Sequence, residues 1–333
     1  MLALVALVLA ADPQFSVTPN GWVRPSFASH DGFAVAARLG LEAQSEAYRV
    51  RARIEVELQP EPSLTDAFVN FSPSPILSVN LGQLKVPYSV AYLAADTRRQ
   101  LPQTSIAVDQ GNFGRDIGAL VEARLPIAQK VRATLSGGVF NGEGRNRIEN
   151  VNDAMLYAGR LNITPFGTRE RPFEGTGREI YLGFGGGYVY NLTGEDSTST
   201  EINAFAAELQ LSVDVFSLQG EFLSKEVVHA DATVEDFEVR GAYGQLGCFI
   251  PAPWFREHVE VVARGGWSEP NTAFDAQGFQ EEVAIDAGLN LYVPEAPKWL
   301  HDTKLQVAYR HVIQMEGEEI ADDRLDVVGT VRF

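Results

Sequence analysis

Hydrophobic and polar residues alternate along most of this chain, in segments of about ten residues. In the last segment, Leu325 and Val327 share one face of an extended strand, whereas Arg324 and Asp326 share the other. A period of two is typical of a β-strand with one apolar and one polar face. The pattern predicts sixteen strands: Gly21–Ala28, Gly32–Ala43, Tyr48–Leu58, Leu64–Phe71, Ile76–Lys85, Asp116–Leu125, Val131–Asn141, Met155–Phe166, Glu179–Leu192, Asn203–Asp214, Val215–Glu226, Phe237–Phe249, His258–Trp267, Glu281–Val293, Thr303–Met315 and Arg324–Phe333.

The lengths and number of these segments favour a membrane barrel. A tilted strand crosses the bilayer in roughly 9–11 residues, and bacterial barrels have an even number of strands. A soluble β-sandwich also alternates, so alternation alone leaves both folds open. The connectors decide between them, because outer-membrane barrels have short turns at one end and longer loops at the other. We therefore predict an all-β fold, a transmembrane antiparallel up-and-down β-barrel of about 16 strands.

The third outward connector, Val86–Arg115, is the longest and has no strand pattern of its own. Gly142–Ala154, another outward connector, is also long and polar, whereas the inward connectors Gln44–Ala47 and Ser72–Pro75 are short. A long loop inside a compact domain usually has a function. We expect the third loop to fold into the lumen and narrow it.

The first eleven residues, Met1–Ala11, form an apolar run that ends in small residues. This is typical of a secretory signal peptide cleaved near Ala10 or Ala11, although no Lys or Arg precedes the apolar core. The alternative is a short buried strand. We expect residues 1–11 to be a signal peptide and residues 12–333 to form a single barrel domain.

Composition narrows the possible functions. The net charge of −17 argues against a nucleic-acid partner. The sequence contains no run of eighteen apolar residues, so it predicts no transmembrane helix. Cys248 is the only cysteine, so no disulfide can form within the chain.

Aromatic residues at strand ends predict a membrane–water interface at one rim of the barrel. Phe166, Trp254, Trp299 and the terminal Phe333 fall at the same predicted end. A final amphipathic strand that ends on Phe also resembles the C-terminal signal read by the barrel-assembly machinery. These features predict the bacterial outer membrane, with membrane lipid and lipopolysaccharide as partners.

Several motifs resemble the phosphate-selective porin family, porins O and P. They include LGQLKVPYS at Leu81–Ser89, GRDIGALVEARL at Gly114–Leu125, LSGGVFNGEGRN at Leu135–Asn146 and AGRLNITPFG at Ala158–Gly167. The resemblance implies a sixteen-stranded barrel, usually a homotrimer, that passes anions through a lumen narrowed by the third loop. The resemblance implies the fold. It does not imply phosphate specificity, because the chain has only five lysines.

Charge is distributed unevenly between the two halves of the predicted barrel. Residues 1–166 contain 15 basic and 15 acidic residues, whereas residues 167–333 contain 12 and 29. Strand order is circumferential order, so the two halves form opposing walls, and a transverse field could set the ion preference. Alternatively, these charges pair across strands and only hydrate the interior. Alternation predicts as pore-lining Arg38, Arg49, Arg51, Arg53, Arg124, Arg132, Arg160, Glu208, Glu221, Glu238 and Glu260. We expect Arg49, Arg51 and Arg53 in particular to have few acidic partners.

Charged residues of the third loop are candidates for a constriction of the pore. They are Asp96, Arg98, Arg99, Asp109 and Arg115. Lys85 precedes the loop, and strict alternation directs it toward lipid unless a bulge near Gly82 turns it inward.

The sequence contains no nucleophile elbow, P-loop or zinc-protease motif, so we expect no enzymatic activity, no catalytic residue, no metal and no cofactor. The predicted function is an outer-membrane porin, a passive diffusion channel for small hydrophilic solutes and ions, anions such as phosphate among them, with weak selectivity. The alternative is a plugged barrel that serves as a surface receptor or structural anchor.

Overall fold

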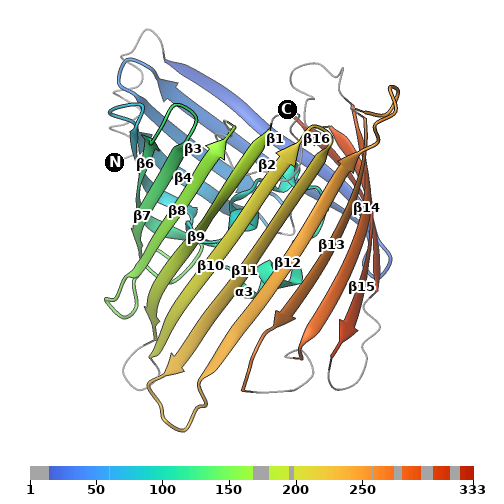
Figure 1. The fold of residues 1–333 in the computed structure, drawn as a ribbon. Helices are drawn as coiled ribbons and strands as arrows, with labels where there is room; N and C mark the ends of the chain where they lie inside the picture. Colours follow the sequence, from blue (N-terminus) through green and yellow to red (C-terminus); the bar gives the residue numbers. More distant parts are fainter. Residues whose placement is uncertain are drawn as a thin grey trace.

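A computed structural model describes residues 15–59, 61–167, 180–194, 199–256, 258–273, 280–293, 303–315 and 323–333. Its strands form one closed antiparallel barrel (Figure 1). The strands are β1 (Ser16–Ala28), β2 (Gly32–Ser45), β3 (Val50–Glu57), β4 (Ser63–Phe71), β5 (Leu77–Lys85), β6 (Arg115–Pro126), β7 (Arg132–Phe140), β8 (Leu156–Phe166), β9 (Tyr181–Thr193), β10 (Thr200–Val213), β11 (Phe216–His229), β12 (Phe237–Phe249), β13 (Val259–Glu269), β14 (Glu282–Tyr292), β15 (Lys304–Gln314) and β16 (Arg324–Arg332).

Each strand pairs with its neighbours in sequence, and β1 pairs with β16 to close the sheet. Trp22 faces Arg332 in this last register, and Gly21 and Phe333 exchange two backbone hydrogen bonds of 3.0 Å. Closure leaves no sheet edge. The backbone N–H and C=O groups of an open edge would find no hydrogen-bond partner in lipid. The predicted sixteen-stranded barrel is confirmed. The proposed signal peptide, residues 1–11, lies outside the described residues.

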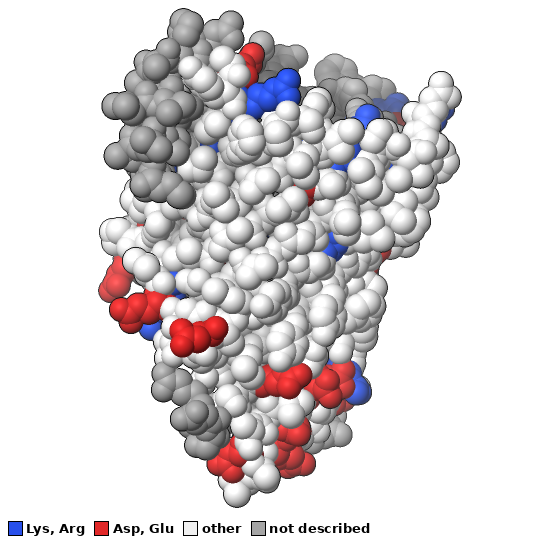
Figure 2. Space-filling view, turned by 90° about the vertical axis from the view of Figure 1, so that its left-hand side faces the viewer, with Lys and Arg blue, Asp and Glu red and all other residues white. Residues whose placement is uncertain are grey.

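The outer face of the barrel is apolar. On β2, Phe33, Val35 and Leu41 are exposed, while Arg38 and Glu42 alternate with them and point into the lumen. The space-filling view shows a surface that is mostly uncharged over the middle of one side, with acidic side chains gathered toward the lower end (Figure 2). This is the alternation expected for a sheet between lipid and a wet interior.

The two ends of the barrel differ in their connectors. At the end where β1 begins and β16 ends, the connectors 46–49, 72–76 and 127–131 are short (Figure 1). The connectors 167–180, 250–258 and 293–303 at the same end are longer, but the two longest connectors of the barrel, 86–114 and 141–155, both lie at the opposite end. Short turns face the periplasm and long loops face outward in such barrels. We call these the periplasmic and outer ends.

The connector 86–114, called L3 below, lies inside the barrel. It contains α2 (Val90–Leu93), the 3-10 turn η1 (Asp96–Arg98) and α3 (Ile106–Gly111), and Figure 1 shows these helices within the ring of strands. α3 packs against β11, β12 and β13. Apolar side chains of L3, among them Tyr88 and Val108, share a buried cluster with Phe140 and Leu223 of the wall. The dry core of the molecule is therefore the contact between L3 and the wall.

Lys85 departs from strict alternation. Its ammonium group lies in the lumen and donates to the backbone oxygens of Tyr92 and Ala94, at 2.5 and 2.9 Å, where α2 ends. Gly82 has a φ of 129°, which only glycine adopts readily. The pairing of β5 with β4 and β6 stays regular, so the backbone turns at Gly82 without a register shift.

We expect Gly82→Ala to destabilise the barrel by at least about 2 kcal/mol, because a Cβ would be strained at this φ and would lie 2.2 Å from the Ala67 oxygen. The measurement is the urea midpoint of protein refolded into lipid vesicles, followed by heat-modifiable gel mobility. Gly159→Ala is the control, since nothing lies within 4 Å of its Cβ position. Equal midpoints for the two variants would contradict this account.

Candidate functional site

The beginning of L3 is fixed to β10 and β11. The Tyr88 hydroxyl donates to the backbone oxygens of Phe205 and Ser224, at 2.7 and 3.2 Å. Burial, with the charge of Glu221 nearby, raises the pKa of Tyr88, so this hydroxyl keeps its proton. At Gly187 of β9, a Cβ would lie 2.9 Å from the Tyr88 oxygen. The backbone of L3 therefore packs directly against the backbone of β9 at Gly187.

Glu221 on β11 is the acceptor for the first turn of α2. Its carboxylate receives the Val90 N–H at 2.9 Å, the Ala91 N–H at 3.3 Å and the Ser89 hydroxyl at 3.1 Å. The carboxylate is 3% exposed. A buried carboxyl group needs such partners, because it loses its hydration.

The middle of L3 is fixed through Gln100, which is also buried. Its amide donates to Glu260 at 2.6 Å and to Ser217 at 2.9 Å, and it accepts from Gln245 at 2.8 Å. The amide of Asn290 donates to the Gln100 backbone oxygen at 2.8 Å. Four strands thus hold one residue of the loop, three of them through its side chain.

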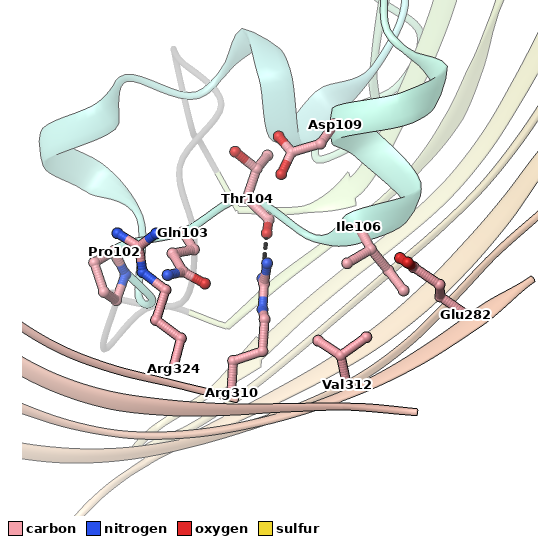
Figure 3. A pocket seen from close by; sticks show the side chains of 9 residues that line it. All are labelled: Pro102, Gln103, Thr104, Ile106, Asp109, Glu282, Arg310, Val312 and Arg324. Atoms are coloured by element: carbon pink, nitrogen blue, oxygen red, sulfur yellow. Dashed lines mark hydrogen bonds between the residues drawn. The ribbon is translucent and has the colours of Figure 1, made fainter. Parts of the chain in front are cut away.

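The far part of L3 rests on two arginines. Arg264 and Arg310 bind the two oxygens of Asp286 at 2.8 and 2.7 Å. Both also donate to the backbone oxygen of Thr104, as Figure 3 shows for Arg310. Gln103 donates to Asp326. L3 is therefore attached along the wall formed by β8–β16.

These contacts change the role of the predicted acidic wall. Glu208, Glu221 and Glu260 lie inside the barrel, but they are at most 7% exposed. Glu208 pairs with Arg160, which also donates to the Tyr88 oxygen at 2.7 Å. The three carboxylates are held under or beside L3 instead of facing the pore. The expectation of a field from an exposed acidic wall is wrong for these residues.

Glu238 does not line the lumen. It pairs with Arg240 and shares a strand face with Leu246, which is exposed on the outside of the barrel. Val239 and Tyr243, on the other face of β12, are buried inside. The prediction failed because the alternation in β12 was assigned with the wrong parity.

The opposite wall, formed by β1–β7, carries paired arginines. Arg53 binds Glu55, and Arg51 lies 3.8 Å from Glu42. The expectation of few acidic partners is therefore wrong for Arg51 and Arg53. The signal was present in the sequence, because Glu55 shares the inward face with Arg51 and Arg53. Arg49 lies in the turn before β3, with a φ of 51°, and donates to the backbone oxygen of residue 73.

The narrow part of this side is a cluster around Asp96 of L3. Arg38 and Arg99 bind its two oxygens at 3.0 and 3.2 Å, and Arg38 also contacts Glu55 at 3.3 Å. Arg24 completes the cluster, lying over the Trp22 ring at 5.8 Å, and forms no ion pair with a described carboxylate.

Asp96 is ionised. Burial alone would raise the pKa of this carboxyl, but the charges of Arg99, Arg38, Lys85 and Arg24 outweigh burial and lower its pKa well below the usual range. Several cations thus surround this carboxylate, and Arg38 is shared with two further carboxylates, Glu55 and Glu57.

The remaining predicted residues are distributed along the lumen. Arg115 binds Asp66 at 2.7 Å, and Arg124 binds Glu122 at 2.7 Å near the periplasmic end. Arg132 lies exposed at the start of β7. Two residues belong to L3: Arg98 in η1 is half-buried, and Asp109 on α3 is exposed.

Asp109 lines a cavity of about 410 Å³ between L3 and β14–β16 (Figure 3). Arg310 and Arg324 line the same cavity. A second cavity, of about 440 Å³, lies toward the periplasmic end and is lined by Arg49, Arg51 and Arg124. Arginines therefore border both cavities.

Sequence reasoning missed the residues that attach L3, above all Gln100 and Tyr88. Neither is charged, and the connector has no periodicity that would orient them. The described part of the chain holds no group of three or more His, Cys, Asp or Glu side chains suited to a metal ion. Among the described residues, no helix is long and apolar enough to cross a membrane.

We expect Glu221→Ala to weaken the attachment of L3 by about 2–4 kcal/mol, because three buried donors lose their acceptor. The loop should then fluctuate, which raises open-channel current noise in planar bilayers. Glu226→Ala, on the same strand but exposed, is the matched control. Unchanged noise in Glu221→Ala would show that this carboxylate does not hold the loop.

Comparisons with known proteins support the architecture. OmpT of Vibrio cholerae with loop L8 deleted superimposes with a TM-score of 0.64 at 8% identity, covering 96% of this chain and 100% of that one. The trimer form of OmpT gives 0.61 at 8%, covering 96% and 99%. An anion-selective porin from Comamonas acidovorans gives 0.61 at 13%, covering 96% and 99%. At these identities, the likeness concerns the fold.

A search of curated protein sequences gives no match. The family model described as "Phosphate-selective porin O and P" matches residues 33–256. This match covers more than half of the chain and includes L3 with the strands that hold it. The chain therefore belongs to the phosphate-selective porin O and P family, porins of the bacterial outer membrane.

Proposed function

We propose that this porin is a passive diffusion channel for small hydrophilic solutes, with a weak preference for anions such as phosphate. The observation that carries the proposal is the cluster of Arg24, Arg38 and Arg99 around Asp96, in which Arg24 has no carboxylate partner among the described residues. Fixed charges on low-dielectric walls select ions by sign. The Comamonas acidovorans porin of the same fold is anion-selective.

The net charge of −17 does not oppose this proposal, because much of the acidic excess lies outside the lumen. Glu226, Asp231, Glu235 and Asp236 are exposed near the outer end of β11 and β12. The carboxylates inside the second wall are matched by Arg160, Arg264, Arg310 and Lys304, or are covered by L3. The exposed lumen therefore owes its sign mainly to the arginines of the first wall.

Selectivity should be weak because most of these arginines have acidic partners. Arg38, Arg51 and Arg53 each lie within 4 Å of a carboxylate. Arg24, Arg98 and Arg132 have no such partner among the described residues, and they contribute most of the uncompensated charge. A dense lysine lining is absent from the described lumen, where Lys85 is already bound to backbone oxygens.

The assembly we propose is a homotrimer, as the family resemblance implies and as the trimer form of OmpT supports for this fold. Residues 1–11 would serve as the export signal. Phe333 would present the last strand to the barrel-assembly machinery. The apolar belt would contact lipid, and the outer carboxylates would lie near lipopolysaccharide. We propose no enzymatic activity.

The alternative, a plugged barrel acting as a receptor or anchor, makes a different electrical prediction. L3 covers the second wall, and a plug would have to block the first wall as well. Discrete conductance steps in planar bilayers support the channel, and their absence supports the anchor.

We expect Asp96→Asn to shift the reversal potential in a KCl gradient toward anions and Arg99→Gln to shift it toward cations. One unit charge at about 8 Å in water is worth roughly 0.5 kcal/mol, or about a twofold change in the permeability ratio. Asp153→Asn, on the exposed connector 141–155, is the matched control. If Asp96→Asn shifted the potential no more than Asp153→Asn did, the cluster would lie outside the ion path.

A further inference from the structure

A third cavity, of about 580 Å³, lies near the periplasmic end beneath the beginning of L3. Pro87, Val90 and Leu93 of L3 cover it on one side, and Leu120 of β6 and Tyr181 of β9 line the barrel side. The volume is within the usual range for small-molecule sites. The cavity is distinct from the cluster around Asp96, which does not line it.

The lining of this cavity is amphipathic. The residues named above supply an apolar surface, and the cationic groups are Lys85, Arg124, Arg132 and Arg160. The one lining carboxylate among the described residues is Glu122. A cavity that only hydrated ions crossed would gain nothing from an apolar lining, because such ions keep their water.

The four cations differ in their freedom to bind a ligand. Lys85 is committed to the backbone oxygens at the end of α2, and Arg160 to Glu208 and the Tyr88 oxygen. Arg124 pairs with Glu122, but its side chain remains 58% exposed.

Arg132 is exposed and forms no hydrogen bond or ion pair with a described residue through its side chain. Its guanidinium group is therefore the cation that this cavity offers to an anion.

We propose that this cavity binds organic anions with an apolar body, in which a carboxylate meets Arg132 while an aliphatic or aromatic chain lies against Leu93 and Leu120. The proposal rests on the anion path proposed above and adds a substrate class to it. Small inorganic anions would pass the cavity, whereas arylalkyl carboxylates would dwell in it. Bidentate binding of a carboxylate by a guanidinium group suits the planar geometry of both.

The test uses the full-length porin in planar bilayers with KCl on both sides. Acetate, butyrate and 4-phenylbutyrate are added in turn to each side, and the concentration that halves the single-channel conductance is measured. We expect block to strengthen by about two- to fourfold for each added methylene that is buried. It should be stronger from the periplasmic side, and inorganic phosphate should not block in the same way.

Two variants and one control locate the site. Arg132→Gln should weaken block by 4-phenylbutyrate roughly three- to fivefold, as expected for an exposed ion pair. Leu93→Ser should weaken it without changing the weak effect of acetate. Arg147→Gln removes the same charge from the exposed connector 141–155 and should leave block unchanged. Unitary conductance in KCl verifies that each variant forms a channel.

Equal block by acetate and 4-phenylbutyrate would overturn the proposal, and so would equal block in the wild type, Arg132→Gln and Leu93→Ser. The reversal potential without organic anions is a separate readout. A cation-selective channel that still binds 4-phenylbutyrate through Arg132 would refute only the proposed anion preference. An anion-selective channel indifferent to chain length would refute only this binding site.

Discussion

The buried carboxylates of the second wall need hydrogen-bond donors, and L3 supplies them. Glu221 and Glu260 point inward from β11 and β13, where they have lost almost all contact with water. Without partners, each would cost several kcal/mol of stability. The first N–H groups of α2 and the amide of Gln100 satisfy them. In return, wall side chains such as Asn290 satisfy backbone oxygens of the loop that face the same interior.

This mutual satisfaction determines which side of the barrel stays open. L3 lies on β8–β16 because the unpaired donors and acceptors of loop and wall match there, and the apolar cluster around Val108 and Leu223 strengthens the contact. The lumen that remains is bordered by the arginines of β1–β7 and by Asp96, Arg98 and Arg99 of the loop. L3 thus covers the carboxylates of the wall β8–β16 and adds charged groups to the lumen beside β1–β7.

The net charge of the chain also differs from the charge of the groups that a passing ion meets in the lumen. The chain is strongly acidic, yet exposed carboxylates such as Asp231 and Glu235 gather toward the outer end, where the acidic side chains of Figure 2 also lie. Inside, arginines of neighbouring strands alternate with Glu42, Glu55 and Asp66, so the first wall is a partly compensated basic surface. Such a surface can favour anions without binding them tightly.

The sequence by itself determined the barrel, because a period of two is a local property that fixes which side chains face lipid and which face water. It therefore predicted sixteen strands, the long third connector and the inward direction of Arg38 and Glu221. It could not determine the pairing of Arg51 with Glu42, which depends on the register between β2 and β3, or the outward direction of Glu238, which depends on parity within one strand. Only the tertiary structure placed Gln100 against Glu260, 160 residues away. The connector that carries Gln100 has no periodicity, and the contact exists only because closing the barrel brings the far wall within reach of the loop.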